Sequence, residues 1–94
     1  MSYKLDFEEH AFKEFEKLGA PLRDQFKKKL KGILVNPHIP ANRLSGMPDC
    51  YKIKLRSAGY RLVYQVNNEE VIVLVLAVGK RDRSEVYNAA KARL

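Results

Sequence analysis

Three basic residues alternate with apolar ones in the segment 50–56, a pattern that could contact a negatively charged ligand. In a β-strand this spacing turns Lys52, Lys54 and Arg56 to one face and the apolar side chains to the other. Like charges that lie together in a sheet lower its stability, so folding alone gives no reason to gather them. The simplest reason for the cluster is an anionic partner on that face.

A fourth cation joins this face across a predicted β-hairpin. Residues 57–59 are a turn signal, and a second strand begins with Arg61. With the turn centred on Ala58 and Gly59, Arg56 pairs with Arg61 and Lys54 pairs with Val63. The hairpin then presents all four cations on the same side of the sheet.

Three more cations, Lys80, Arg81 and Arg83, follow the most aliphatic segment of the chain, residues 71–78. This segment is apolar on both faces, which predicts a strand in the centre of a sheet. Short turns join it to the preceding strands as a meander. The end of the central strand should therefore lie near the start of its neighbour, which brings Arg81 towards Arg61.

Tyr87 lies four residues after Arg83, where it either faces the same groove or packs as a core aromatic. In the groove, the set could cleave RNA by attack of a 2′-hydroxyl on the adjacent phosphate, which needs a proton acceptor, a proton donor and cations. Neighbouring cations favour the anion of a tyrosine, whose pKa is normally ~10. A guanidinium is a poor acid because it holds its proton above pH ~12. Efficient cleavage would therefore depend on something else holding the RNA in the reactive geometry, worth roughly 7–11 kcal/mol.

No other group of residues in the sequence competes with this set. His10 lies among the surface charges of a predicted helix and His38 lies in a loop, and nothing brings the two together. A lone cysteine, Cys50, excludes an internal disulfide and a CxxC site. The acidic residues are scattered and there is no glycine-rich phosphate loop, so we expect neither a metal nor a cofactor.

Composition and charge are those of a basic globular protein. The 94 residues carry a net charge of +7 with 46% hydrophobic residues, and the positive excess lies in residues 36–94. We expect one domain spanning residues 1–94, with either the electrostatic footprint of a nucleic-acid binder or a basic solvated surface. No segment reads as a signal peptide or approaches ~18 consecutive apolar residues, which predicts a cytoplasmic protein without a membrane span.

Hydrophobic periodicity predicts the elements that position these cations. The order β-α-α-β-β-β-α predicts an α+β fold in which an antiparallel sheet carries a helical hairpin on one face and the cations on the other. The C-terminal helix has few large apolar residues and should be the most easily displaced element. The predicted elements are an edge strand at 3–7, helices at 8–18 and 21–35, strands at 50–56, 61–66 and 71–78, and a helix at 84–94.

Further basic residues lie outside the hairpin face. Lys27-Lys28-Lys29 on the second predicted helix is either a solvated surface or a contact with nucleic acid or an acidic partner. The residues that we predict to bind RNA or the ribosome are Arg56, Lys80, Arg83, Lys27 and Lys28.

The chain resembles the RelE toxins of bacterial type II toxin–antitoxin pairs over its whole length. The segments that carry the resemblance are LSGMPDCYKIKLRS (44–57), GYRLVYQV (59–66), VGKR (78–81) and SEVY (84–87). The first two segments are specific. The resemblance implies a RelE-like fold and a ribosome-dependent mRNA endonuclease. The family cuts mRNA in the ribosomal A site by 2′-hydroxyl attack and leaves a 2′,3′-cyclic phosphate without a metal.

The catalytic set of the family maps onto Lys52, Lys54, Arg61, Arg81 and Tyr87. The resemblance implies that Tyr87 is the general base and Arg81 the general acid. The other three cations would stabilise the transition state and help to activate the tyrosine, while the ribosome supplies the RNA geometry. Family members can carry a basic residue just before the glycine of the first segment, where this chain has Ser45, so an RNA contact at that position is not implied.

The resemblance also implies partners. These are the 70S ribosome with mRNA in its A site and a RelB-type antitoxin that wraps the toxin and displaces its C-terminal helix. The complex would bind operator DNA only through the antitoxin. Two alternatives are a ParE-like toxin, which poisons DNA gyrase and lacks this cationic set, and a non-catalytic RNA- or ribosome-binding module, which charge alone supports.

Overall fold

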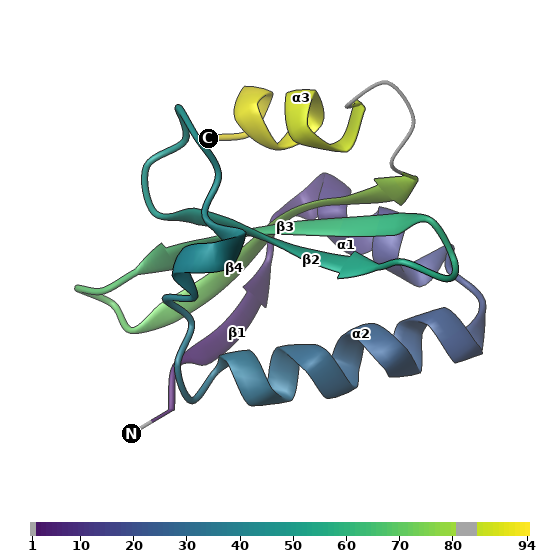
Figure 1. Cartoon of the computed structure of the whole chain (residues 1–94), viewed down its shortest axis with the longest axis horizontal. Helices are drawn as coiled ribbons and strands as arrows, with labels where there is room; N and C mark the ends of the chain where they lie inside the picture. Colours follow the sequence, from purple (N-terminus) through teal and green to yellow (C-terminus); the bar gives the residue numbers. More distant parts are fainter. Residues whose placement is uncertain (1, 81–84) are drawn as a thin grey trace.

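The computed structural model describes residues 2–80 and 85–94, and its elements follow the predicted order (Figure 1). The α+β class and the order β-α-α-β-β-β-α are confirmed. The elements are β1 (Lys4–Phe7), α1 (Glu9–Glu16), α2 (Ala20–Ile33), a short 3-10 helix (Pro40–Asn42), β2 (Cys50–Leu55), β3 (Tyr60–Asn67), β4 (Ile72–Lys80) and α3 (Glu85–Ala92).

The four strands form one mixed sheet in the order β1-β4-β3-β2. The predicted meander is confirmed, since β2, β3 and β4 pair antiparallel, and β4 is central with β1 at the edge. The prediction of a wholly antiparallel sheet is wrong at β1, which pairs parallel to β4. The Tyr3 N–H donates to the Leu34 carbonyl at 2.8 Å, so α2 ends beside the start of β1. The next strand, β2, starts at the same end of the sheet as β1 and runs in the same direction. Two antiparallel pairings, β2 with β3 and β3 with β4, then make β4 parallel to β1.

The β2–β3 hairpin has a longer turn than the sequence predicted. Lys54 pairs with Arg61, so the predicted register was wrong by two residues and Arg56 lies in the turn. The Gly59 N–H donates to the Arg56 carbonyl at 3.3 Å. Gly59 itself has φ +68°, a left-handed conformation that favours glycine. A slip of two residues keeps every side chain on its face, so Lys52, Lys54 and Arg61 still share one side of the sheet.

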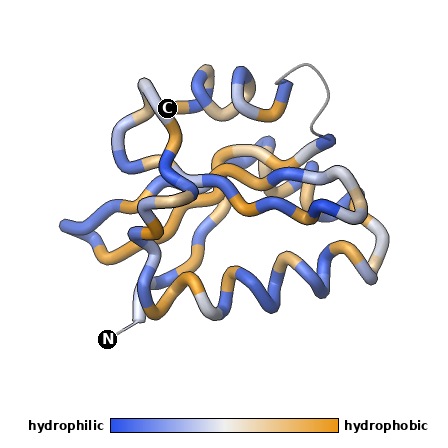
Figure 2. Tube along the Cα trace, in the orientation of Figure 1, coloured by the Kyte–Doolittle hydropathy of each residue, from blue (hydrophilic) through white to orange (hydrophobic). Residues whose placement is uncertain are grey.

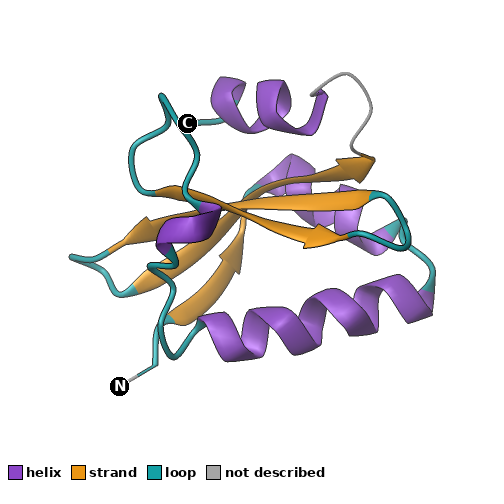
Figure 3. Cartoon of the chain, in the orientation of Figure 1, coloured by secondary structure: helices purple, strands orange, loops and turns teal. Residues whose placement is uncertain are grey.

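Helices lie on both sides of the sheet (Figure 3), and hydrophobic and hydrophilic positions alternate along α2 (Figure 2). Each face of the sheet has its own cluster of buried hydrophobic residues. The larger cluster packs α1 and α2 on one face, with Phe26 and Leu30 on the buried side of α2. The smaller cluster packs α3 on the opposite face, where Val86 and Ala90 contact the sheet around Val63. The predicted packing of the helical hairpin on one face is confirmed.

Both N-terminal helices begin where the sequence provides a starting signal. The Glu8 carboxylate accepts a hydrogen bond from the Ala11 N–H at 2.9 Å and so caps α1. Pro21 lies in the first turn of α2, where its missing N–H costs nothing. Within the described ranges, no helix is both long and apolar enough to span a bilayer.

Two side chains cover the edge of β4 beyond the end of β1. The Glu14 carboxylate accepts a hydrogen bond from the Val78 N–H at 3.1 Å, and the Arg93 guanidinium donates to the Leu76 carbonyl at 2.9 Å. Glu14 and Arg93 also bind each other through two hydrogen bonds of 2.8 and 3.1 Å. We call this pair the edge clasp. It joins α1 to the C-terminal end of α3.

Candidate functional site

The predicted cations of β2 and β3 lie together on the sheet face that α3 partly covers. Lys54 stands directly opposite Arg61 in the ladder, and Lys52 stands opposite Val63. Residues directly opposite each other in an antiparallel pair have Cβ atoms ~4.5–5.5 Å apart. Arg61 is only 8% exposed and both lysines are half-buried. We call Lys52, Lys54 and Arg61 the cation face.

The positive charges of the cation face repel one another. The pKa of Lys54 is lowered chiefly by the charge of Lys52, with smaller contributions from burial, Arg56 and Arg61. In the part of the chain that the structure describes, ion pairs join Glu8 to His10 and Arg93, and Glu14 to Arg93, and none reaches the cation face. An uncompensated cluster of this kind is a candidate binding site for an anion.

Arg61 is held in place by the fold. Its Nη1 donates to the Tyr60 carbonyl at 3.0 Å. Gly79 stands opposite Arg61 on β4, so the position directly opposite the arginine carries no side chain. A guanidinium has five N–H donors, and the bond to Tyr60 is the only one from this group among residues 2–80 and 85–94. Its remaining donors make no hydrogen bond within these residues, which makes them candidates for binding a phosphate.

Tyr87 lies on α3, over the same face of the sheet as the three cations. Its side chain is half-buried and packs against the smaller cluster, so it contacts the core, whereas its role in the site stays a prediction. Gly79 also lies beneath α3, because a Cβ placed there would be 3.9 Å from the Cβ of Val86. Arg81 and Arg83 lie outside the described residues. The structure thus brings four of the five predicted catalytic residues to one face.

The predicted RNA-binding residues are dispersed. Arg56 is exposed in the β2–β3 turn, and Lys80 is exposed at the end of β4, opposite Tyr60. Lys27 and Lys28 are exposed on α2, which packs on the other face of the sheet. Contact of these residues with RNA or the ribosome stays a prediction.

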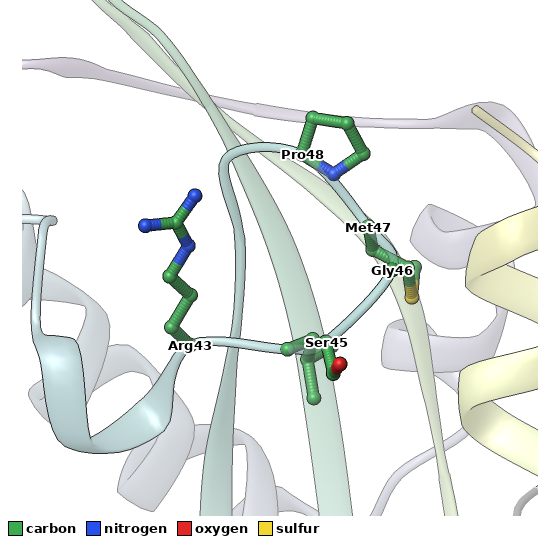
Figure 4. Close-up of a pocket in the computed structure, with 6 residues that line it drawn as sticks. Arg43, Ser45, Gly46, Met47 and Pro48 are labelled. Atoms are coloured by element: carbon green, nitrogen blue, oxygen red, sulfur yellow. The ribbon is translucent and has the colours of Figure 1, made fainter.

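The loop before β2 is ordered around a hollow of about 530 Å³ (Figure 4). The Leu44 N–H donates to the Cys50 carbonyl at 2.9 Å, and Gly46 has φ +74°. Met47 is buried in the cluster beneath α3, whereas Ser45 is exposed on the loop. Arg43 lines the same hollow and was not among the predicted site residues. Its position two residues before Ser45 in an extended segment could have pointed to it.

The two histidines belong to separate hydrogen-bond networks, as the sequence predicted. His10 contacts the Glu8 carboxylate at 2.8 Å at the start of α1. His38 contacts the Tyr51 hydroxyl at 3.0 Å and the Asn68 side-chain oxygen at 2.8 Å. His38 therefore links the loop after α2 to β2 and to the β3–β4 turn, a structural role that the sequence alone did not indicate.

Other reactive groups are buried or dispersed. Burial, with the nearby Asp49 charge, raises the pKa of the Cys50 thiol to about 11, so the thiol stays protonated at neutral pH. Among the residues that the structure describes, no three His, Cys, Asp or Glu side chains converge on a point that could hold a metal ion. The chemistry available on the cation face is therefore that of fixed positive charges and a phenol.

Comparison with known proteins gives consistent matches over the whole chain. Residues 5–85 match a family described as the ParE toxin of the type II toxin–antitoxin system, parDE. The chain is 63% identical to the mRNA interferase toxin RelE of Escherichia coli (strain K12) over 94 residues, which are 100% of this chain and 99% of that protein. It is also 63% identical to the mRNA interferase RelE of Shigella flexneri, with the same coverage.

Solved structures match equally well. A double mutant of E. coli toxin RelE in the free state superposes with a TM-score of 0.93 at 61% identity, covering 100% of this chain and 99% of that chain. The toxin of the intact E. coli RelBE toxin–antitoxin complex has a TM-score of 0.84 at 62% identity, covering 87% of this chain and 100% of that chain.

Proposed function

We propose that this chain, which belongs to the RelE toxins within the ParE toxin family of type II toxin–antitoxin systems, is a ribosome-dependent mRNA endonuclease. One observation carries the proposal. Lys52, Lys54 and Arg61 gather on one face without a carboxylate partner among the described residues, and the helix that bears Tyr87 lies over the same face. Fixed cations of this kind stabilise the charge that develops on a phosphate under attack.

The reaction is an intramolecular transfer at phosphorus. The mRNA 2′-hydroxyl oxygen forms a bond to the adjacent phosphorus as the bond from phosphorus to the 5′-oxygen of the next nucleotide breaks. Tyr87, as a phenolate, takes the 2′-hydroxyl proton, and Arg81 protonates the departing 5′-oxygen. The products are a 2′,3′-cyclic phosphate and a free 5′-hydroxyl, and the cation face stabilises the added negative charge on the phosphate.

The ribosome is required because the protein's own acid and base are weak. A guanidinium gives up its proton reluctantly, and a phenol is mostly protonated at neutral pH. Holding the 2′-oxygen in line with the bond that breaks is worth roughly 7–11 kcal/mol, which a bound A-site codon can supply. The purified protein should therefore cleave free RNA barely at all.

A RelB-type antitoxin is the proposed partner that neutralises the protein. The similar E. coli toxin was solved in complex with RelB. On this chain the antitoxin would displace α3, which rests on the smaller of the two clusters. The complex would bind operator DNA through the antitoxin, and the protein would act in the cytoplasm, where its ribosomal substrate lies.

The test is cleavage of mRNA on programmed ribosomes with 5′ ends mapped, using Arg81→Ala and Tyr87→Phe. Both variants should lose A-site cleavage by at least roughly 10²-fold, the smallest effect typical of removing a group that acts in the transition state. Lys31→Ala, an exposed change on α2, is the matched control and should cleave like the parent. Cleavage at the parental rate by both site variants would show that the roles are wrongly assigned.

A second candidate function follows from the family description, which names the ParE toxin. A chain of that kind would act on DNA gyrase and leave mRNA intact. Induction in cells separates the two. A-site cuts in mRNA without DNA damage support the endonuclease, and gyrase-dependent DNA damage with intact mRNA supports the alternative. Stable binding to ribosomes with neither effect would indicate a non-catalytic binding module.

A further inference from the structure

A groove runs along the open edge of β2, between that strand and α2. It has a volume of about 300 Å³ and is lined by Lys29 of α2, Asn42 of the 3-10 helix, and Lys54 and Arg56 at the end of the hairpin. An adjoining hollow of about 440 Å³ shares Lys29, Lys54 and Arg56. The three cations come from two different elements, so the tertiary fold and not local sequence places them together. We call the two hollows the edge groove.

The charged side chains that line the edge groove are all positive. No Asp or Glu of the described residues lines either hollow. Lys29 and Arg56 are both exposed, so their charges are accessible to a ligand. Isoleucines 33, 39 and 53 form the apolar part of the lining. A ligand that suits these walls is a negatively charged chain with apolar parts, which describes a sugar–phosphate backbone.

The backbone of β2 adds a hydrogen-bond donor to the groove. The Val66 N–H donates to the Asp49 carbonyl at 2.9 Å, towards β3, whereas the Cys50 carbonyl accepts from the Leu44 N–H at 2.9 Å, away from β3. In an antiparallel pair this direction alternates, so the N–H groups of Lys52 and Lys54 point away from β3. The bridge between Arg43 and Tyr51 covers the edge beside Lys52, so the Lys54 N–H is the one that lies at the open part of the edge. Lysines on an edge strand disfavour pairing with another strand, so the open edge suits an anion better than a peptide.

The edge groove is continuous with the cation face through Lys54. This residue lines both hollows, and it also stands opposite Arg61 of the neighbouring strand β3. An RNA strand whose scissile phosphate lies at the cation face would therefore place neighbouring phosphates at the groove. This position favours the mRNA itself over ribosomal RNA, because the two sites share a residue.

We propose that the edge groove is a second RNA subsite, which binds the mRNA backbone next to the scissile phosphate through Lys29 and Arg56. The assignment rests on the proposed endonuclease function. It selects Lys29 from the lysine triplet of α2, of which the sequence pattern had singled out Lys27 and Lys28. Neither of these two lines the groove.

The experiment measures binding to ribosomes with and without mRNA in the A site, in a Tyr87→Phe background that prevents cleavage. Lys29→Glu and Arg56→Glu should each weaken binding to programmed ribosomes by roughly tenfold. The dependence of log K on log salt should also lose about 0.7 per phosphate contact removed. Lys29→Arg keeps the positive charge, so it should bind programmed ribosomes as tightly as the parent. The matched control is Lys31→Glu, the same charge change on an exposed residue of the same helix that lines neither hollow, and it should have little effect.

Equal weakening by Lys29→Glu and Lys31→Glu would overturn the proposal, because only total charge would then matter. Equal weakening on ribosomes that lack A-site mRNA would also overturn it, because the contact would then be to ribosomal RNA. Unchanged urea unfolding midpoints for all variants show that the fold is intact. Intact A-site mRNA after incubation with the parent chain would refute the endonuclease function. Normal cleavage by the parent with unchanged binding by Lys29→Glu would refute the groove alone.

Discussion

The two faces of the sheet differ in how they are built and in what they can do. The α1–α2 face is covered by two helices and contains the larger cluster, with Phe26 and Leu30 almost inaccessible to solvent. The opposite face is covered by one short helix over a smaller cluster, and its β2 edge carries cations that repel one another. Stability on one side allows the other side to keep a destabilising but useful arrangement of charge.

Among the changes that test this difference between the faces, Phe26→Ala should have the largest effect on the free energy of unfolding. This side chain is 0% exposed, and its loss leaves a cavity that costs about 3–5 kcal/mol of the free energy of unfolding. Urea unfolding measures the loss. Val86→Ala, on the α3 face, should cost clearly less because it removes fewer buried atoms from a smaller cluster. Equal losses from the two changes would contradict the assignment of most stability to the hairpin face.

Lys54→Met should separate stability from activity. Single-turnover cleavage on programmed ribosomes should fall roughly 10²–10³-fold, the range found when one transition-state contact is removed. The urea unfolding midpoint should rise, because the change relieves the repulsion from Lys52. Lys31→Met, also on the surface, should alter neither quantity. A lower midpoint for Lys54→Met would mean that this lysine stabilises the fold.

Arg93→Gln should loosen α3 from its C-terminal end. The guanidinium binds the Glu14 carboxylate and the Leu76 carbonyl, and hydrogen bonds to a charged group contribute about 1.5–3 kcal/mol each when they are largely shielded. Amide hydrogen exchange should quicken in α3 and leave α2 unchanged. Faster exchange in both helices would indicate global destabilisation and not a local release.

The smallest effect concerns the ionisation of Lys54. Its folded-state pKa is lowered, so between that value and the unfolded value of ~10.5 the unfolded chain binds more protons and stability rises with pH. The positive charge of Lys54 thus lowers the stability of the fold at neutral pH. This loss of stability begins to disappear as the pH rises through the lowered pKa, and it is gone above the unfolded value. In Lys52→Met the pKa of Lys54 should move back up, which side-chain NMR titration would detect. An unchanged pKa would mean that Lys52 is not the main cause.

Some features of the fold could be predicted from the sequence and others could not, and the difference has physical reasons. Side-chain alternation placed Lys52, Lys54 and Arg61 on one face correctly, because a register error of two residues preserves the face. The register itself depended on the left-handed conformation of Gly59, which the sequence permits but does not require. The direction of β1 in the sheet depended on where α2 ends. The four residues of this edge strand do not indicate whether it pairs parallel or antiparallel.

The candidate site also contains some residues that could be predicted from the sequence and others that could not. Periodicity locates residues within one hairpin, which is why the cation face was predicted. The edge groove joins Lys29 to Arg56 across two elements, and within the lysine triplet of α2 all three side chains are exposed, so sequence spacing could not distinguish them. Arg43 and His38 were missed because loops before β2 show no periodicity that reports their contacts.

The edge clasp has a consequence for self-association. Beyond the end of β1, the Val78 N–H and the Leu76 carbonyl would be open to pairing with a strand of another molecule, and Glu14 and Arg93 occupy them instead. Arg93 directly follows α3, so it leaves this edge whenever that helix is displaced. Glu14 belongs to α1 and stays on the Val78 N–H, so a partner that replaces α3 must supply a new donor for the Leu76 carbonyl to keep this edge of β4 closed to another strand.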